Sequence, residues 1–297
     1  MRNFIFSVVP IVLFLGIAIA QESTNPVSKK KHIHKVMIDS IERNYYLYIP
    51  KNRKSKAPLV FVFHGYSSSA LDINRNTKFN QIADQNGFVI CYPQGLKDEK
   101  GKAFWQVGYS FHKNLNVNDV KFVKVLTHFL QNEYDLSKNN VFITGFSNGG
   151  DFCNLLSCQT ESVFKAVAPI ISCFMKEFYD QCDQAKAIPT FMLNCTQDQI
   201  TYWDGDMANQ QGYGAYLPTV DMIDLRTRQI NYDMRKRDTI LSKSPKDKTL
   251  IAIDRYINSK TNNQVWMYKV INGGHGYPTY LDLEKEIWRF FSLYLEN

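Results

Sequence analysis

The stretch that decides the fold is Val141-Phe142-Ile143-Thr144, followed by Gly145-Phe146-Ser147-Asn148-Gly149-Gly150. The first four residues are apolar or β-branched and predict a buried strand, and residues 151–157 predict a helix. Glycines two positions before and two positions after Ser147 allow a tight turn in which strand and helix come close together. The alternative is a glycine-rich turn with an ordinary serine, but the strand–turn–helix context favours a nucleophilic serine.

Strand and helix signals alternate on both sides of this turn. We expect strands at residues 59–63, 88–92, 141–144, 166–171, 190–194, 250–257 and 265–271, and helices at 79–85, 119–133 and 220–234. We also expect an N-terminal hairpin of residues 35–41 and 45–49 around Glu42-Arg43-Asn44, and a final helix with an apolar face of Leu283, Ile287, Phe290, Phe291 and Tyr294. This alternation predicts an α/β fold, in which helices cover both faces of a mostly parallel sheet.

Two later residues complete a candidate catalytic set with Ser147. In a fold of this kind the acid follows the serine and the histidine comes last, each on a loop after a strand. Asp198 follows the strand 190–194, and His275 follows the strand 265–271 with glycines on both sides. His275 is the one histidine that comes after Ser147 in the chain. Asp204 and Asp206 are rival acids in the same loop as Asp198, which we prefer.

The chemistry predicted for this set is acyl transfer. His275 would take the proton of Ser147 as the serine attacks an ester carbonyl, and Asp198 would fix the imidazole tautomer. The oxyanion that forms needs preset donors. We expect these to be the backbone N–H groups of Asn148, at the start of the helix, and of Tyr66, in the loop after the strand 59–63.

The N-terminus has the pattern of an export signal. Arg2 precedes a nearly continuous apolar run from residue 4 to residue 19, and Ala18-Ile19-Ala20 fits a cleavage site. We therefore expect a signal peptide at 1–20, a polar flexible leader at 21–34 and one catalytic domain at 35–297. The alternative for the apolar run is a membrane anchor. The prediction is a soluble exported protein, periplasmic or extracellular, with no stable membrane insertion.

The six cysteines permit disulfides in an exported protein. There is no C-x-x-C pair and no histidine at zinc-finger spacing, so we expect neither a metal nor another cofactor. Cys153 and Cys158 would lie on different faces of one helix, which argues against their pairing. Cys173 and Cys182 bracket a loop, and we expect a bridge between them. The alternative is that most of the cysteines are small buried hydrophobic residues.

The formal charge of +7 is spread over short clusters, among them Lys29-Lys30-Lys31 and Arg235-Lys236-Arg237. No stripe of aromatic residues accompanies them, so we interpret these clusters as solvated surfaces and expect no nucleic-acid partner. The oligomeric state is not predicted.

From about residue 36 to residue 296 the chain resembles the secreted polyhydroxybutyrate depolymerase/feruloyl esterase group of α/β-hydrolases, the carbohydrate esterase family 1 type. The motifs that carry this resemblance are residues 59–65, Gly87-Phe88-Val89-Ile90, Tyr92-Pro93, 118–122, 145–150, 164–169, Asp198 and Gly273-Gly274-His275. The resemblance implies an α/β-hydrolase fold with Ser147, Asp198 and His275 as its triad. In two places the sequence departs from the family pattern. Asn194-Cys195 stands where the family usually has His-Gly, and Tyr277-Pro278 where it usually has Trp-Pro.

The resulting hypothesis is a secreted serine esterase that acts on feruloyl or acetyl esters of oligo- or polysaccharides. A polyester depolymerase and a non-catalytic carbohydrate-binding relative are the alternatives. Four aromatic residues are expected in loops near the cleft, where they would stack on a sugar or an aromatic acyl group: Trp105, Tyr109, Trp203 and Tyr277. We expect Tyr277 to line the leaving-group side. The alternative for each is ordinary loop packing.

Overall fold

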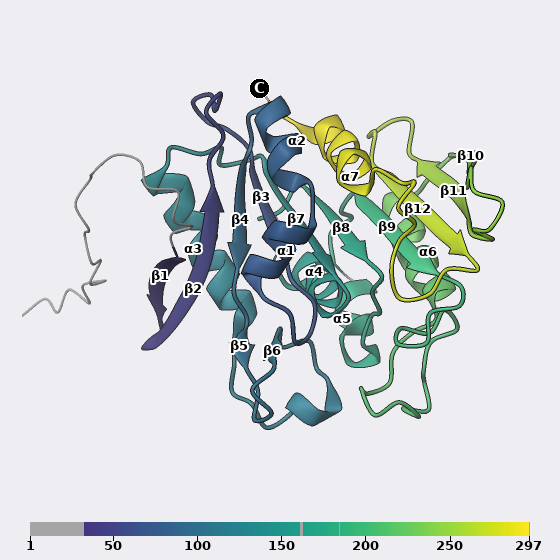
Figure 1. Cartoon of the computed structure of the whole chain (residues 1–297), viewed down its shortest axis with the longest axis horizontal. Helices are drawn as coiled ribbons and strands as arrows, with labels where there is room; N and C mark the ends of the chain where they lie inside the picture. The colour runs from purple at the N-terminus through teal and green to yellow at the C-terminus, as the bar shows by residue number, and fades with distance from the viewer. Residues whose placement is uncertain (1–32, 161–162, 184, 297) are drawn as a thin grey trace, which may run out of the picture.

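Six parallel strands form the centre of the sheet. The computed structural model describes residues 33–160, 163–183 and 185–296, and its main sheet has ten strands in the order β1-β2-β4-β3-β7-β8-β9-β12-β11-β10 (Figure 1). The strands from β4 to β12 run parallel, and the antiparallel pairs β1–β2 and β11–β10 extend the two ends. The predicted signal peptide and nearly all of the predicted leader lie outside the described residues.

The strands have the following bounds: β1 Ile33–Ile38, β2 Ile41–Tyr48, β3 Leu59–Phe63, β4 Val89–Pro93, β7 Val141–Phe146, β8 Ala166–Ile170, β9 Thr190–Cys195, β10 Met234–Leu241, β11 Leu250–Ile257 and β12 Gln264–Ile271. A separate small pair is formed by β5 (Leu96–Lys97) and β6 (Ala103–Phe104). All five side chains of β3, β4 and β8 are buried. Burial on both faces explains why these strands appear in the sequence as continuous apolar runs.

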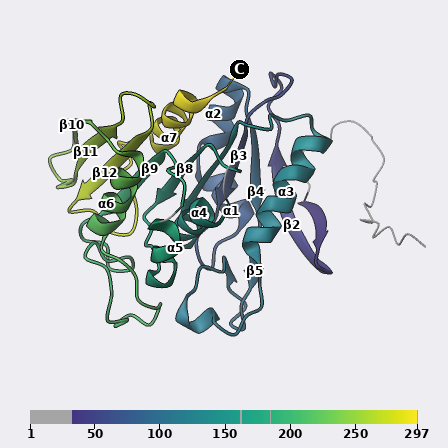
Figure 2. The same cartoon turned by 180° about the vertical axis from the view of Figure 1, so that it is seen from behind.

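Helices cover both faces of the sheet. One face carries α1 (Ala70–Asn76), α2 (Phe79–Asn86) and α7 (Leu283–Phe291), which lie in front of the strands in Figure 1. The other face carries α3 (Asp119–Glu133), α4 (Asn148–Gln159), α5 (Tyr179–Asp183) and α6 (Thr219–Ile230), and Figure 2 shows α3 and α6 on that side. Short 3-10 turns occur at Ser110–His112, Lys176–Phe178 and Ser292–Tyr294. The apolar core therefore lies in two layers, one on each face of the sheet.

Most predicted elements are present, and two boundaries were wrong. The first hairpin turns at Asp39 and Ser40, whose φ angles are +50° and +64°, rather than at residues 42–44. The helix expected at 220–234 ends at Ile230, because Asn231 takes the left-handed conformation at φ +50° and stops it. Met234 instead begins β10, an edge strand that the apolar pattern did not indicate.

The predicted disulfide was also wrong. Cys182 pairs with Cys158, not with Cys173. Because α5 returns alongside α4, Cys182 comes to the last turn of α4. Cys173 stays at the end of β8, where its N–H donates to the carboxylate of Asp151 at 2.7 Å. Cys91, Cys153, Cys173 and Cys195 are free thiols, and all four are buried.

The turn at Ser147 depends on the absence of side chains at its glycines. A Cβ atom on Gly149 would lie 2.5 Å from the carbonyl oxygen of Phe63 and 2.6 Å from that of His64. A Cβ atom on Gly145 would meet the carbonyl oxygen of Gly149 at 2.4 Å. These neighbours are backbone atoms that cannot rotate away, so glycine at both positions lets β7, β3 and α4 approach each other.

We therefore expect Gly149→Ala to lower the free energy of unfolding by about 2 kcal/mol or more, since overpacking against backbone forces the chain to shift. Gly274→Ala is the matched control, because a Cβ atom there would have no atom within 4 Å. Urea unfolding followed by circular dichroism measures both variants. Equal stability of the two variants would contradict this account of the turn.

Candidate active site

Ser147 lies at the turn between β7 and α4, in a backbone conformation that is rare for a residue with a side chain. Its φ and ψ angles are +53° and −124°. Its N–H donates to the carbonyl of Ile170 on β8 at 2.9 Å, and its carbonyl accepts from the N–H of Asp151 at 2.9 Å. These bonds hold the strained turn in place. The turn projects the hydroxyl group of Ser147 toward the carboxyl ends of the neighbouring strands.

The structure brings the three predicted triad residues into one hydrogen-bonded chain. His275 Nε2 lies 3.0 Å from Ser147 Oγ, and His275 Nδ1 lies 2.7 Å from Asp198 Oδ2. With the Nδ1–H donating to the carboxylate, Nε2 is left free to accept the serine proton. Ser147, Asp198 and His275 follow β7, β9 and β12. These strands are far apart in the chain, but their carboxyl ends lie on the same side of the sheet.

Asp198 is held in a fixed orientation. Its Oδ1 atom accepts from the N–H groups of Ile200 at 2.8 Å and Thr201 at 2.9 Å, which leaves Oδ2 for His275. The rival acids lie elsewhere. Asp206 is buried and accepts from the N–H groups of Gln210 and Gln211, so it supports its own loop, and Asp204 is exposed. The geometry favours Asp198 over both.

The backbone N–H groups of Tyr66 and Asn148 lie on the two segments that flank Ser147. In the described part of the chain neither N–H donates to a protein acceptor, and Tyr66 itself lines the pocket beside Ser147. His64, close by, has a different role. Burial lowers the pKa of His64 to about 4, so its ring is neutral, and its Nε2 accepts from the N–H of Gly95 at 3.0 Å. His64 therefore supports the loop that carries Tyr66.

A pocket of about 250 Å³ opens beside Ser147 and His275. Its other lining residues are Tyr66, Ser67, Tyr109, Cys173, Ile200, Thr201, Tyr213 and Tyr216. Four of these are tyrosines, of which Tyr66 and Tyr213 are partly exposed and Tyr109 and Tyr216 are buried. Tyr213 and Tyr216 were not singled out from the sequence. The available signal was their position in the long loop after β9, which also carries Asp198.

The four aromatic residues expected near the cleft have different places. Tyr109 lines the pocket. Trp105 does not, because it is completely buried between Phe63 and Phe152, and its indole N–H donates to the carbonyl of His64 at 2.9 Å. Its expected contact with substrate is therefore wrong.

Trp203 and Tyr277 also lie outside the lining of this pocket. The ring of Trp203 has the ammonium group of Lys269 over it, 4.5 Å from the ring centroid. The ring of Tyr277 packs on Phe146, and its hydroxyl donates to Glu284 at 3.2 Å. Tyr277 thus joins the His275 loop to α7.

Asp151, in the first turn of α4, is a second buried carboxyl group near the pocket. It accepts from the hydroxyl of Tyr109 and from the N–H of Cys173, two residues that line the pocket. Burial raises the pKa of Asp151 to about 7, although both hydrogen bonds act to lower it. Asp151 therefore fixes one wall of the pocket. This role could not be predicted from the sequence, because Asp151 follows Ser147 in a helix and has no charged partner nearby in the chain.

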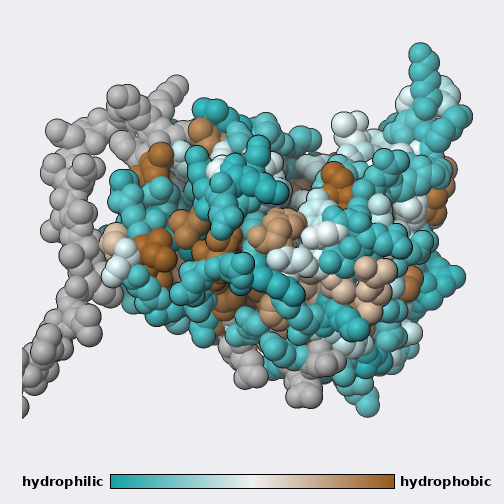
Figure 3. Space-filling model, turned by 90° about the horizontal axis from the view of Figure 1, so that it is seen from below, coloured by the Kyte–Doolittle hydropathy of each residue, from teal (hydrophilic) through white to brown (hydrophobic). Residues whose placement is uncertain are grey.

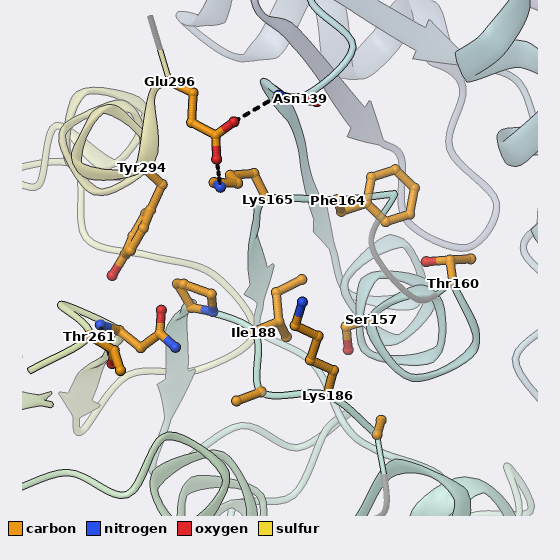
Figure 4. Close-up of a pocket in the computed structure, with 14 residues that line it drawn as sticks. Asn139, Ser157, Thr160, Phe164, Lys165, Lys186, Ile188, Thr261, Tyr294 and Glu296 are labelled. Carbon is orange, nitrogen blue, oxygen red and sulfur yellow. Dashed lines mark hydrogen bonds and ion pairs between the residues drawn. The ribbon is translucent and has the colours of Figure 1, made fainter.

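A larger cavity, of about 480 Å³, lies at the opposite side of the sheet, near the amino-terminal ends of the parallel strands. Figure 4 shows Ser157, Lys186, Ile188 and Tyr294 around it, with Glu296 joined to Asn139 and Lys165. None of the described residues that line it is a histidine, and the hydroxyl of Ser157 donates to the carbonyl of Asn154, so this serine has no imidazole base beside it.

The described residues hold no group of three or more His, Cys, Asp or Glu side chains arranged to bind a metal ion. None of their helices is both long and apolar enough to cross a membrane.

Comparison with known proteins agrees with the sequence resemblance. The family model described as "Esterase PHB depolymerase" matches residues 43–185. A bifunctional acetylxylan esterase/xylanase of Neocallimastix patriciarum is 24% identical over 252 residues, which cover 84% of this chain and 33% of that protein. Feruloyl esterase B of Piromyces equi is 25% identical over 154 residues, which cover 51% of this chain and 28% of that protein. The chain thus spans about a third or less of the length of these two relatives.

Solved structures show the fold. An acetyl xylan esterase from Aspergillus awamori superimposes with a TM-score of 0.62 at 14% identity, covering 87% of this chain and 99% of that one. An S-formylglutathione hydrolase from Agrobacterium tumefaciens superimposes with a TM-score of 0.58 at 11% identity, covering 89% of this chain and 95% of that one. The predicted α/β-hydrolase fold is therefore confirmed, as is the resemblance of this chain to the polyhydroxybutyrate depolymerase/feruloyl esterase group.

Proposed function

We propose that this protein is a serine carboxylic ester hydrolase that removes acyl groups from polysaccharide-derived substrates. The observation that carries this proposal is the hydrogen-bonded chain Ser147–His275–Asp198 at a strained turn beside an aromatic pocket. Esterase names among the relatives and an esterase fold support the same activity. A protein that only binds carbohydrate would not need these three side chains in one hydrogen-bonded chain.

The reaction follows from this geometry. His275 Nε2 takes the proton of Ser147 as Oγ attacks the ester carbonyl, and Asp198 stabilises the imidazolium that forms. The Tyr66 and Asn148 N–H groups receive the developing oxyanion, where the loss of one donor costs about 100-fold or more in rate. His275 then protonates the departing alcohol and leaves an acyl group on Ser147. Water, activated by the same imidazole, releases the acid and restores the serine.

The pocket favours an aromatic acyl group over an acetyl group. An acetyl methyl would leave most of the 250 Å³ empty, whereas a hydroxycinnamoyl ring could pack against Tyr66 and Tyr213, the partly exposed tyrosines of the lining. We therefore place feruloyl esters first and acetyl esters second. The family description keeps polyester hydrolysis as a second candidate function.

Four substrates separate these possibilities: methyl ferulate, p-nitrophenyl acetate, acetylated xylan and a soluble hydroxybutyrate oligomer. We expect kcat/KM to be highest for methyl ferulate among substrates with unactivated leaving groups. Faster hydrolysis of the hydroxybutyrate oligomer than of any sugar or hydroxycinnamoyl ester would favour the polyester candidate. Hydrolysis of none of the four would contradict the proposed function.

Tyr213 and Tyr277 provide a matched pair of aromatic residues inside and outside the pocket lining. We expect Tyr213→Ala to raise KM for methyl ferulate several-fold more than KM for p-nitrophenyl acetate, because the smaller acyl group has no ring to lose contact with. Tyr277→Ala should affect both substrates equally, because its ring supports the His275 loop. A selective effect of Tyr277→Ala, with none from Tyr213→Ala, would reverse the assignment of the acyl pocket.

Export of the protein is part of the proposal. The support is the sequence of residues 1–20 alone, with its apolar run and cleavage pattern. N-terminal sequencing of the protein released by its own host should begin at Gln21. A mature protein that retains Arg2 would contradict the predicted signal peptide.

A further inference from the structure

Short positive clusters occur along the whole sequence, but most of the net charge lies in one hairpin. Residues 234–260 hold eight Lys and Arg and three Asp, a net charge of +5, which leaves +2 for the other 270 residues. The eight are Arg235, Lys236, Arg237, Lys243, Lys246, Lys248, Arg255 and Lys260. This segment, which we call the basic hairpin, contains β10, β11 and the loop 242–249 between them.

Most of these charges are exposed and incompletely paired. Arg235 and Arg237 share one carboxylate, that of Asp254, at 2.8 and 3.1 Å. Across the described residues no carboxylate pairs with four exposed lysines, namely Lys236, Lys243, Lys246 and Lys260. The basic hairpin therefore presents an uncompensated positive field to solvent.

The loop of the basic hairpin lies beside the loop that carries His275. Leu241 pairs with Leu250, which pairs with Ile271, so the loop 242–249 emerges at the same edge of the sheet as the His275 loop (Figure 1). The side chain of Asn272 donates to the carbonyl of Lys248 at 3.1 Å and joins the two loops. Figure 3 views this edge directly, and its right-hand side, where β10 and β11 lie, is mostly hydrophilic.

Protection of an edge strand does not account for the whole cluster. Charged side chains on β10 would discourage pairing with another sheet. Lys243 and Lys246, however, lie in the loop beyond the strand pair, where there is no exposed strand edge to protect. The position of Lys243 and Lys246 fits a ligand that extends from the edge strand β10 toward the loop of His275.

We propose that the basic hairpin is a docking surface for an acidic polysaccharide, whose uronate carboxylates contact its Lys and Arg side chains. Guanidinium and ammonium groups pair with carboxylates, and exposed pairs are individually weak, so binding needs several contacts along a chain. A polyanion held here would lie beside the loop that carries His275, which Asn272 joins to Lys248. Presentation of its ester groups to Ser147 rests on the proposed function, but binding itself does not.

The test measures binding in the absence of turnover. In a Ser147→Ala background, titration with polygalacturonate at low salt is compared with titration with neutral arabinoxylan. The variant K236Q/K243Q/K246Q removes three lysines without breaking an internal ion pair. K51Q/K54Q/K186Q is the matched control, because it removes the same charge from exposed lysines at the opposite edge of the sheet.

We expect polygalacturonate to bind, arabinoxylan to bind at least about tenfold more weakly, and affinity for polygalacturonate to fall as salt screens the contacts. The hairpin variant should weaken polygalacturonate binding about tenfold, and the control variant should have little effect. If the two variants weakened binding equally, net charge alone would explain the binding, and the proposal would be overturned. The proposal would also be overturned if duplex DNA or phosphatidylglycerol vesicles bound more tightly than polygalacturonate. It would be overturned as well if the hairpin variant formed oligomers but bound polygalacturonate as the parent protein does.

Discussion

Replacement of Ser147 by alanine is expected to lower kcat for methyl ferulate by about five to six orders of magnitude, while the fold stays intact. The reason is that the base, His275, has its Nε2 atom 3.0 Å from Ser147 Oγ, so the hydroxyl of Ser147 is the one positioned to lose its proton. Loss of the nucleophile in a serine–histidine–acid set costs rates of this order. Alanine has the same Cβ as serine, so the strained turn at φ +53° is kept.

The measurement needs a control for the fold. Thermal unfolding of Ser147→Ala should match that of the wild type within a few degrees, and Ser244→Ala, at an exposed serine outside the pocket lining, should retain most of the activity. Activity in Ser147→Ala above about a hundredth of the wild-type value would remove Ser147 from the mechanism. If Ser147→Ala loses both its activity and its fold, the role of Ser147 is tested instead with the closer replacement Ser147→Cys.

Asp198→Asn is expected to lower kcat by about four orders of magnitude. An amide at this position would donate to His275 Nδ1, and the imidazole would then carry its proton on Nε2, where it cannot accept from Ser147. The backbone bonds from Ile200 and Thr201 to Oδ1 can still form, so the loop should keep its conformation. The effect should appear in kcat far more than in KM.

Asp204→Asn and Asp206→Asn serve as comparisons in the same loop. Asp204→Asn should leave kcat almost unchanged, because this residue is exposed. Asp206→Asn should lower stability, since its carboxylate accepts from Gln210 and Gln211, but it should leave the His275 geometry intact. A larger kcat loss for either variant than for Asp198→Asn would show that the acid of the set was wrongly assigned.

The parts of the fold that the sequence predicts well are those where one physical signal dominates. The strand at residues 59–63 and the helix at 119–133 have their predicted bounds, because the first is buried on both faces and the second has a clear apolar stripe and an Asn118 cap. β10 has no such signal. Its side chains from Met234 to Thr239 are all exposed, so no periodic apolar pattern marks it as a strand.

The candidate site divides in the same way. Ser147, Asp198 and His275 could be selected because chain order and strand ends constrain them, and the structure brings them together. Their catalytic roles stay predictions. Trp105 could not be placed, since its burial depends on Phe63 and Phe152, which lie far from it in the sequence. The Cys158–Cys182 pair likewise depends on the path of α5 beside α4.

The proposed mechanism passes an acyl group through Ser147, and this group can be trapped on the protein. The wild-type protein is mixed with excess p-nitrophenyl ferulate, quenched in acid and digested, and its peptides are mapped by mass spectrometry. We expect one feruloyl group on the peptide that contains Ser147, and none when His275→Ala is treated in the same way. A pre-steady-state burst of p-nitrophenolate with no adduct on Ser147, or an adduct on another residue, would contradict it.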